Sequence, residues 1–464
     1  INNIQRLYVR GGGRCRQLMV ETIADAYKRL LAPSMENEFA VLSKLRADEE
    51  AVGVFAENLR QLLLAAPLGQ KRVMGVDPGI RTGCKVVCLD EQGNLLHNEA
   101  IFPHPPANEK IKAIQSVSAL VNKYGVEVIA IGNGTASRET EEFIKRVPLP
   151  AGVRVFTVSE DGASIYSASE VAREEFPDYD VTVRGAVSIG RRLMDPLAEL
   201  VKIDPKSLGV GQYQHDVDQS LLKETLDNTV ESCVNNVGVN LNTASSYLLS
   251  YVSGIGPALA ENIVEYRSEH GAYKSRKELL KVKRLGDKAF EQCAGFLRIQ
   301  GADNPLDNSA VHPEAYHIVD KMADDLGVAA RDLVGNTELC SKIDPSRYVD
   351  AVFGLPTIND IITELRKPGR DPRESAQEFE FAHDIHTIED LYVGMELPGI
   401  VTNITAFGAF VDVGIKQNGL IHASQMGVKG MADPSRILKL HQKVKVSVVS
   451  VDLERARIGL RLLK

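Results

Sequence analysis

The chain has 464 residues, of which 44% are hydrophobic and 25% are charged. This length exceeds what one hydrophobic core usually serves, so we expect several domains, and the composition excludes a globally disordered protein. The formal net charge of -8 excludes a uniformly basic nucleic-acid binder, so any contact with nucleic acid must use local patches.

The six cysteines indicate a reducing compartment. They form no CxxC pair and no zinc-type spacing with histidine. The chain shows neither a secretory leader nor an apolar run long enough to span a membrane. We therefore expect a cytoplasmic protein without a membrane partner. Because the chain starts at Ile1 without an initiator methionine, we also expect a fragment of a longer protein.

Residues 1–70 are expected to form a helical segment. Apolar residues recur at helical spacing over 18–31 and again over 55–63. Pro33 and Pro67 are expected to interrupt these helices, because proline lacks the backbone N–H that an interior helical position donates.

Residues 71–203 are expected to form a mixed α/β domain. The short apolar runs VMGVD, CKVVCLD, VEVIAIGN and VRVFTV predict strands, and helical periodicity lies between them at 107–123 and 136–146. A helical run over 188–200 is expected to close the domain.

The first strand of this domain ends in a candidate catalytic acid, Asp77, which Pro78 and Gly79 follow. A carboxylate at a strand end, beside an open turn, is the first requirement of metal-dependent phosphodiester cleavage. A two-metal site needs more acids, and the other strand ends offer Glu160 and the uncharged Asn133. Turn chemistry before Pro-Gly is the alternative explanation for Asp77.

With these residues the domain resembles the YqgF subgroup of RNase H-like, resolvase-type folds. The resemblance implies a further acid near the start of the last helix, where this chain has Arg184, Gly185 and Ser188, with the nearest acid, Asp195, at the other end. We expect the third carboxylate to be missing, and therefore a binding or scaffold role with no catalytic residue and no cofactor. The alternative is a nuclease or resolvase that uses Asp77 and Glu160 with Mg²⁺ or Mn²⁺.

Residues 204–300 are expected to form a helical domain with a phosphate-binding turn. In VSGIGPALAENIVEYRSEHG, the residues Gly254, Ile255 and Gly256 stand between two helices. Two glycines at this spacing allow a tight turn that presents N–H groups at a helix N-terminus, where a phosphate is favoured. The run resembles a helix-hairpin-helix motif, which implies contact with the DNA backbone. A tight helix connection without a ligand is the alternative.

The run VKRLGDKAFEQCAGFLRI resembles a second hairpin. It keeps only Gly286 of the glycine pattern, with Arg284, Asp287 and Lys288 nearby, so phosphate binding at Lys288 and a packing role both stay open. Residues 251–300 hold nine Lys and Arg against six Asp and Glu, so the hairpin region is basic within an acidic chain.

The C-terminal third is expected to contain a helical segment at 301–366, a linker at 367–388 rich in Pro, Gly and charge, and a β-rich domain at 389–464. In the last domain apolar and polar residues alternate, which is typical of antiparallel strands, and a final hairpin is expected to turn near 454–456. Five short strands predict an OB-type barrel. Such barrels bind single strands by stacking bases on exposed aromatic rings.

The strings FGAFVDV and GLIHAS resemble the S1 RNA-binding domain, and the resemblance covers the whole barrel. It implies RNA contacts at five positions: Phe407, Phe410, His422, Asp452 and Arg457. Residues three apart on a regular strand face opposite sides, so one phenylalanine would belong to the core unless Gly408 marks a bulge that turns both outward. The domain holds ten Lys and Arg against seven Asp and Glu.

The order of these modules resembles the bacterial Tex family of transcription accessory proteins, and FAENLRQLLL, VDPGIRTGCK and VGQYQHDV add to the match. The resemblance implies a cytoplasmic factor that binds single-stranded RNA chiefly through the S1 domain, with DNA and the transcription machinery as further partners. Tyr213, Gln214 and His215 of VGQYQHDV are interpreted as a polar interdomain turn. The expected fold class is multidomain α+β, largely helical, with an RNase H-like domain, a helix-hairpin-helix domain and an OB-fold barrel.

Overall fold

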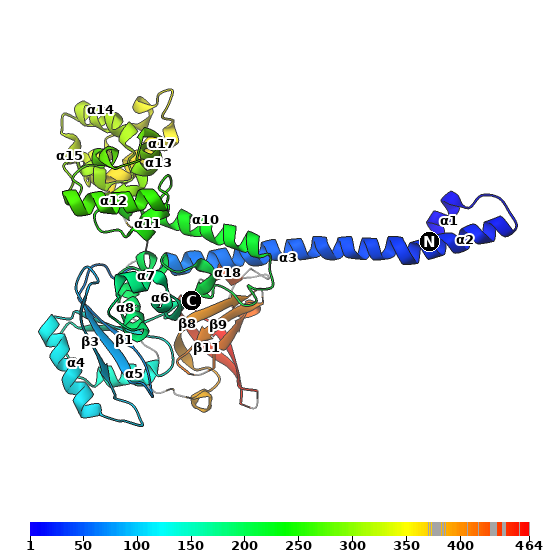
Figure 1. Ribbon diagram of the computed structural model, residues 1–464, viewed down its shortest axis with the longest axis horizontal. Helices are drawn as coiled ribbons and strands as arrows, with labels where there is room; N and C mark the ends of the chain where they lie inside the picture. Colours follow the sequence, from blue (N-terminus) through cyan, green and yellow to red (C-terminus); the bar gives the residue numbers. More distant parts are fainter. Residues whose placement is uncertain are drawn as a thin grey trace.

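A long helix carries the N-terminal end of the chain far from the other domains (Figure 1). It consists of α2 (Arg14–Ala26), a π-helical turn (Tyr27–Leu31) and α3 (Ala32–Leu63), and α1 (Asn2–Tyr8) precedes it. The computed structural model describes the whole chain except 370, 372, 374–381, 383, 384, 386, 406, 416, 427–433, 439–441, 454 and 464, and the side chains of 435 and 436.

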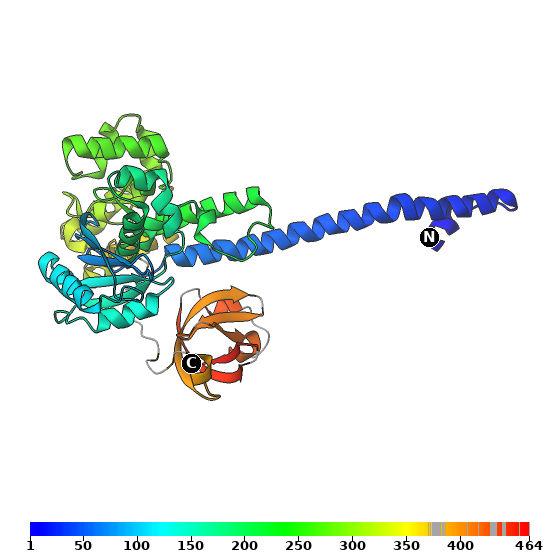
Figure 2. The ribbon, with the colours of Figure 1, turned by 60° about the horizontal axis from the view of Figure 1, so that its bottom comes forward.

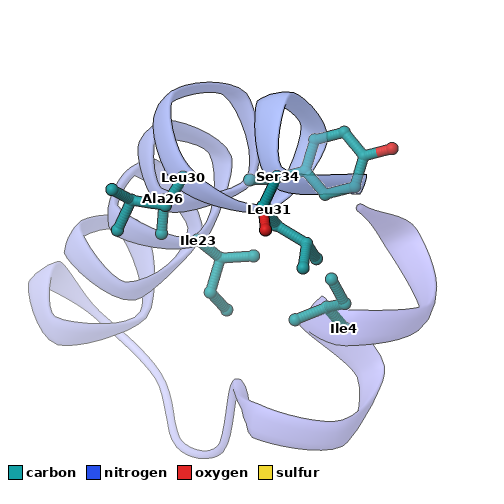
Figure 3. A pocket seen from close by; sticks show the side chains of 7 residues that line it. Ile4, Ile23, Ala26, Leu30, Leu31 and Ser34 are labelled. Atoms are coloured by element: carbon teal, nitrogen blue, oxygen red, sulfur yellow. The ribbon is translucent and has the colours of Figure 1, made fainter. Parts of the chain in front are cut away.

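The helix does not stop at Pro33, so the predicted interruption is wrong. In the π turn, the N–H of Ala32 donates to the carbonyl of Tyr27, five residues back, and this wider turn accommodates the proline that follows. At the far end, α1 folds back towards α2 around a small apolar pocket, where Ile4 lies opposite Ile23 and Leu31 (Figure 3).

The RNase H-like domain is built on a five-stranded sheet with the order β3-β2-β1-β4-β5. Its strands are β1 (Val73–Asp77), β2 (Cys84–Leu89), β3 (Leu95–Ile101), β4 (Val128–Gly132) and β5 (Arg154–Val158). The first three pair antiparallel, and β4 and β5 continue parallel to β1. The edge strand β3 was not predicted, because only its last residue is buried and polar side chains dominate its middle.

Helices cover both faces of this sheet. The helices α4 (Lys110–Tyr124) and α5 (Ser137–Lys145) lie on one face, and α8 (Val181–Met194) lies on the other. A Cβ atom on Gly75 of β1 would lie 2.4 Å from the carbonyl oxygen of Ala186, so the glycine allows α8 to rest directly on the central strand. This contact brings the first turns of α8 over the end of β1.

The closing helix begins earlier than predicted. It starts at Val181, and Asp180 caps it by accepting from the amides of Thr182 and Val183, whereas the sequence indicated a start at 188. The β-branched residues of VTV hide this start, because they favour strands. Short helices flank α8: α6 (Ala163–Ala168), α7 (Glu170–Glu175) and α9 (Pro196–Leu200).

The next domain is helical and shares a core with α3. It contains η2 (Pro205–Leu208), α10 (Gln219–Val237), α11 (Ser246–Ser250), α12 (Pro257–His270), η3 (Arg276–Lys281), α13 (Asp287–Cys293) and η4 (Ala294–Phe296). The helix α10 packs along α3 (Figure 1). The domain is not purely helical as predicted, since β6 (Val239–Asn240) and β7 (Leu297–Arg298) pair in parallel.

A second helical unit follows, and a buried arginine joins it to the first. Its elements are η5 (Pro305–Asn308), η6 (Pro313–Ala315), α14 (Tyr316–Leu326), α15 (Ala330–Leu333), α16 (Thr337–Ser341), η7 (Pro345–Tyr348) and α17 (Leu355–Arg366). The guanidinium of Arg276 donates to the carbonyls of Leu297 and Val311 and to the hydroxyl of Tyr316. Most of the predicted linker at 367–388 lies outside the described residues.

The C-terminal domain is a closed five-stranded barrel with the order β10-β12-β11-β8-β9. Its elements are η8 (Ile388–Asp390), β8 (Glu396–Thr405), β9 (Gly408–Asp412), β10 (Gly419–His422), η9 (Ala423–Gln425), α18 (Pro434–Ile437), β11 (Lys443–Asp452) and β12 (Arg457–Leu462). Figure 2 shows it as a separate body beside α3. The multidomain α+β class is therefore confirmed. Within the described residues, no helix is both long enough and apolar enough to cross a bilayer.

Candidate nucleic-acid interface

Two phenylalanine rings lie on the outside of the barrel. Phe407 occupies the turn before β9 and is 52% exposed, whereas Phe410 lies on β9 and is half-buried. Their ring centroids are 6.2 Å apart and the planes are nearly perpendicular, at 87°. The interior positions of β9 are filled by Ala409 and Val411. Neither phenylalanine therefore belongs to the barrel core.

The rings reach the same side because Phe407 precedes the strand, not because the strand bulges at Gly408. Gly408 is regularly paired with Thr405 and with His422, and the irregularity in the ladder falls on β8, between Val401 and Asn403. The glycine serves a different purpose, since a Cβ atom there would lie 2.4 Å from the carbonyl oxygen of Ile421.

The outer face that carries Phe410 also carries His422 and Arg457. Phe410 is paired with Leu420 of β10, and Leu420 is paired with Gly459 of β12. His422 stands two residues after Leu420, and Arg457 stands two residues before Gly459, so the side chains at these positions point to the outside of the barrel. Both His422 and Arg457 are exposed. The structure therefore exposes an aromatic pair, an imidazole and a guanidinium on the outside of the barrel.

The remaining S1-type position, Asp452, has a local structural partner. It is paired in register with Arg457 where β11 meets β12, and its carboxylate accepts the amide of Arg455 at 3.0 Å. The predicted turn at 454–456 follows it, and Glu454 of this turn lies outside the described residues. Asp452 is exposed and orders the hairpin that holds Arg457.

The first helical hairpin has a tight turn with a left-handed glycine. Gly254 has φ +82°, and Gly256 caps α12 with open space around its Cα atom. Ile255 between them is buried, and its amide donates to the carbonyl of Val252 at 2.9 Å. Gly256 and the first turn of α12 are therefore what this hairpin presents to a ligand, whereas Ile255 anchors the turn.

The second hairpin has the same turn geometry although it lacks the first glycine. Arg284 takes the left-handed conformation with φ +67°, and Gly286 caps α13. Leu285 is buried, and its amide donates to the carbonyl of Val282 at 3.1 Å. The departure from the glycine pattern is thus a change of residue and not of backbone. Lys288 lies exposed in the first turn of α13.

The two hairpins hold each other in equivalent ways. Asn262, the sixth residue of α12, donates from its side chain to the carbonyl of Lys283 in the second turn at 2.9 Å. Gln292, the sixth residue of α13, packs on the turn of the first hairpin. A Cβ atom built on Gly254 of that turn would lie 2.7 Å from the Cβ atom of Gln292. The two turns are therefore fixed relative to each other, and Lys283 and Arg284 are exposed.

Asp77 and Glu160 come together at the ends of β1 and β5. Burial raises the pKa of Asp77 to about 6, the neighbouring Glu160 adds to the rise, and Lys85 opposes it. Burial also raises the pKa of Glu160, against the hydrogen bond that it accepts from the Gly134 amide. The Glu160 carboxylate lies close to Gly132, since a Cβ atom built there would lie 2.7 Å from one of its oxygens.

The residues at this site do not supply a third acid. On α8, Gly185 lies near the Asp77 carboxylate, and a Cβ atom built on it would lie 3.7 Å from Oδ2. The side chain of Asn133 accepts the amide of Glu160 at 3.0 Å and so supports the turn. Across the described part of the chain, no three His, Cys, Asp or Glu side chains lie close enough to hold a metal ion. Two carboxylates without a third do not fit a two-metal site.

The acid nearest the start of α8 is Asp180, not Asp195 as the sequence suggested. Asp180 is committed to capping the helix, and its hydrogen bonds with Thr182 and Val183 lower its pKa. Asp195 instead caps α9 and forms an ion pair with Arg373, whose Nη1 lies 2.6 Å from its Oδ1.

An arginine of the RNase H-like domain contacts the barrel. Arg138 of α5 lies with Nη2 3.3 Å from Oδ1 of Asp412 and donates to the carbonyl of Ile415 at 2.9 Å. Asp412 is the last residue of β9, two positions after Phe410. The contact therefore joins the end of β9 to α5 of the RNase H-like domain.

Family models match four successive parts of the chain. The matches are a Tex protein YqgF-like domain at 71–194, a helix-hairpin-helix motif at 234–298, an HHH domain at 304–373 and an S1 RNA-binding domain at 390–462. The third of these was predicted only as a helical segment. Its helices are short and interrupted by 3-10 turns, so periodicity in the sequence reveals little of its type.

Relatives of similar organisation occur in bacteria and animals. "Transcriptional accessory protein Tex" of Neisseria gonorrhoeae is 52% identical over 95% of this chain and 58% of its own length. "Protein tex" of Bordetella pertussis is 51% identical over 93% of this chain and 55% of its own length. Human "S1 RNA-binding domain-containing protein 1" is 35% identical over 97% of this chain and 51% of its own length. The chain spans little more than half the length of these relatives. By its four domains and these relatives, it belongs to the Tex family of transcription accessory proteins.

Proposed function

We propose that this chain is the nucleic-acid-binding part of a transcription accessory factor, that it holds single-stranded RNA mainly through the barrel, and that it does not cleave it. The observation that carries the proposal is the exposed ring of Phe407 beside Phe410. His422 and Arg457 stand on the same outer face. Aromatic rings stack on bases of any sequence, and a cation beside them attracts the phosphate backbone.

The test is the affinity of the full chain for a labelled single-stranded RNA. Phe407→Ala should weaken binding by about 1 to 3 kcal/mol, the value of one stacked base. Val393→Ala is the matched control, because Val393 is an exposed apolar residue of the same domain, at 65% exposure. If Phe407→Ala binds as tightly as the control, the ring does not stack on RNA and the proposal is wrong.

The absence of cleavage is proposed from Gly185, which stands where the resemblance implies an acid. The competing function is a nuclease or resolvase that uses Asp77 and Glu160 with Mg²⁺ or Mn²⁺. Labelled DNA and RNA incubated with the chain and either metal separate the two. Cleavage that Asp77→Asn abolishes would establish the nuclease and contradict our proposal.

The hairpins are proposed to add contacts with the DNA backbone. The exposed cap at Gly256 offers amides to a phosphate, and Lys288 with Arg284 adds positive charge at the second turn. A contact with the transcription machinery and a cytoplasmic location stay predictions from the resemblance and from the cysteine content.

A further inference from the structure

The loop between η2 and α10, residues 209–218, presents two aromatic rings that the proposed function leaves unused. Tyr213 is 69% exposed, the side chain of His215 is 77% exposed, and their ring centroids are 6.3 Å apart. The other apolar side chains of this loop, Val210 and Val217, are turned towards the core. The two rings are thus the exposed apolar surface of a polar loop.

The first half of the loop is fixed on α3. The carbonyl of the buried Val210 accepts from the side chain of Asn58, itself buried, at 2.8 Å. A Cβ atom on Gly211 would lie 2.1 Å from the ring of Phe55, so only glycine lets the loop rest on this ring. The loop therefore leaves α3 from a defined position.

The second half is fixed by side chains on both sides. The side-chain amide of Gln214 donates to the carbonyl of Lys206, and Gln219 donates to the carbonyl of Gln214 at 2.9 Å. Lys44 of α3 donates to the carbonyl of Asp216 at 2.9 Å. These hydrogen bonds fix the turn that carries the two rings to α3 and to the neighbouring residues Lys206 and Gln219.

The turn itself holds Tyr213 in an unusual conformation. Its carbonyl accepts the amide of Asp216 at 2.9 Å, and its φ of +59° lies in the left-handed region, which is costly for a bulky side chain. Because the Tyr213 side chain is largely exposed, its burial offsets little of this conformational cost. Such positions concentrate where a side chain must be presented to a ligand.

The part of α3 that anchors this loop also faces the barrel. Asn58, which holds Val210, lines a pocket together with Glu57 of α3 and Ile404 of β8. Ile404 stands three residues before Phe407. In Figures 1 and 2 the loop before α10 lies against α3. Strand β8 of the barrel, which leads to Phe407, and the loop with Tyr213 therefore both approach the part of α3 around Asn58.

We propose that Tyr213 and His215 form a second stacking site for a single-stranded nucleic acid that leaves the barrel past Phe407. The inference rests on the proposed function of the barrel. The two ring pairs have nearly equal spacing, 6.3 Å here and 6.2 Å in the barrel. A protein partner would bury a larger apolar core than two rings in a polar loop offer. Asp216 and Asp218 repel phosphates, so the site takes bases and leaves the backbone in water.

The chain contains no tryptophan, which allows a direct test. Tyr213→Trp, Phe407→Trp and Tyr8→Trp each place one fluorescent reporter in the full chain, and Tyr8, exposed in α1 at the far end of the long helix, is the negative control (Figure 1). An RNA of about 5 nucleotides occupies only the barrel, and one of about 20 exceeds a single barrel site. We expect both RNAs to quench the tryptophan fluorescence of Phe407→Trp. Only the longer RNA should quench the fluorescence of Tyr213→Trp, and neither RNA should quench that of Tyr8→Trp.

The binding assay gives an independent readout. The double variant Tyr213→Ala/His215→Ala should lose about fivefold or more in affinity for the longer RNA, keep its affinity for the shorter, and keep the wild-type salt slope because no phosphate contact is lost. Tyr213→Phe should retain the affinity.

The two reporters also separate failure of this inference from failure of the proposed function. If the longer RNA quenches Phe407→Trp but leaves Tyr213→Trp unquenched, the inference is overturned and the rings are assigned to a protein partner. If Phe407→Trp is also unquenched, the proposed function fails and this inference fails with it.

Discussion

Replacing Asp77 by asparagine should stabilise the RNase H-like domain at neutral pH and leave it unchanged in acid. Burial first, and Glu160 second, raise the pKa of this carboxyl from 3.8 to about 6 in the folded chain. The folded state therefore holds the proton more tightly than the unfolded chain. Stability is retained below about pH 4 and declines as the pH rises through about 6, where the buried charge forms. Asparagine carries no charge at any pH and escapes this penalty.

The size of the effect follows from the shift. A rise of about two pKa units corresponds to about 3 kcal/mol at most. Because water reaches part of the carboxyl, we expect about 1 to 2 kcal/mol above pH 7. Thermal unfolding of Asp77→Asn and the wild type at pH 4 and pH 7.5 measures the difference, with Asp178→Asn as the exposed control in the same domain. A difference that is independent of pH, or a variant less stable at pH 7.5, would refute the desolvation argument and indicate a cation held by Asp77.

Three further predictions concern the metal site and the hairpins. Millimolar Mg²⁺ or Mn²⁺ should leave the unfolding temperature of the wild type unchanged, whereas a site filled to 100 times its Kd would add about 2.7 kcal/mol. Gly254→Ala should destabilise the hairpin domain by about 2 kcal/mol, because the φ of Gly254 is positive and a Cβ atom there would crowd Gln292. Gly256→Ala should be tolerated, because the space around Gly256 is open. Calorimetry compares the stability of the two variants. Arg284→Gly should stabilise the fold by about 1 kcal/mol by relieving the left-handed strain, yet weaken binding to duplex DNA in a fluorescence anisotropy assay.

The sequence predicted those elements whose burial leaves a clear pattern. The strands β1, up to its last residue Asp77, and β4 are apolar because helices cover both faces of the sheet, so they were found without ambiguity. The edge strand β3 has one covered residue at its end and carries His97, Asn98 and Glu99, which hid it. The start of α8 was missed because a capping aspartate precedes β-branched residues, a local signal that points to two structures at once.

Prediction of the candidate sites from sequence has a different limit. The effect of a single residue change is ambiguous in the sequence, but the structure shows the backbone conformation and the neighbours of that residue. The loss of a glycine made the second hairpin doubtful, yet Arg284 adopts the left-handed conformation that Gly254 adopts in the first. Conversely, the sequence shows Gly185 only as a position without an acid, whereas the structure shows that a Cβ atom built on it would lie 3.7 Å from the Asp77 carboxylate. Tyr213 had no assignable role until its exposure and strained backbone were known.

The acidic net charge of the chain and its nucleic-acid-binding surfaces are compatible for a physical reason. At physiological salt a charge is screened beyond about 8 Å, so a local group acts on a phosphate largely independently of distant carboxylates. Lys283, Arg284 and Lys288 gather at one hairpin turn, and Arg457 stands on the aromatic face of the barrel. Under the proposed function, weak long-range attraction would reduce indiscriminate binding to duplex. Stacking on Phe407, which salt does not screen, would retain the affinity for unpaired bases. A factor arranged in this way would select single strands by their exposed bases and not by their charge.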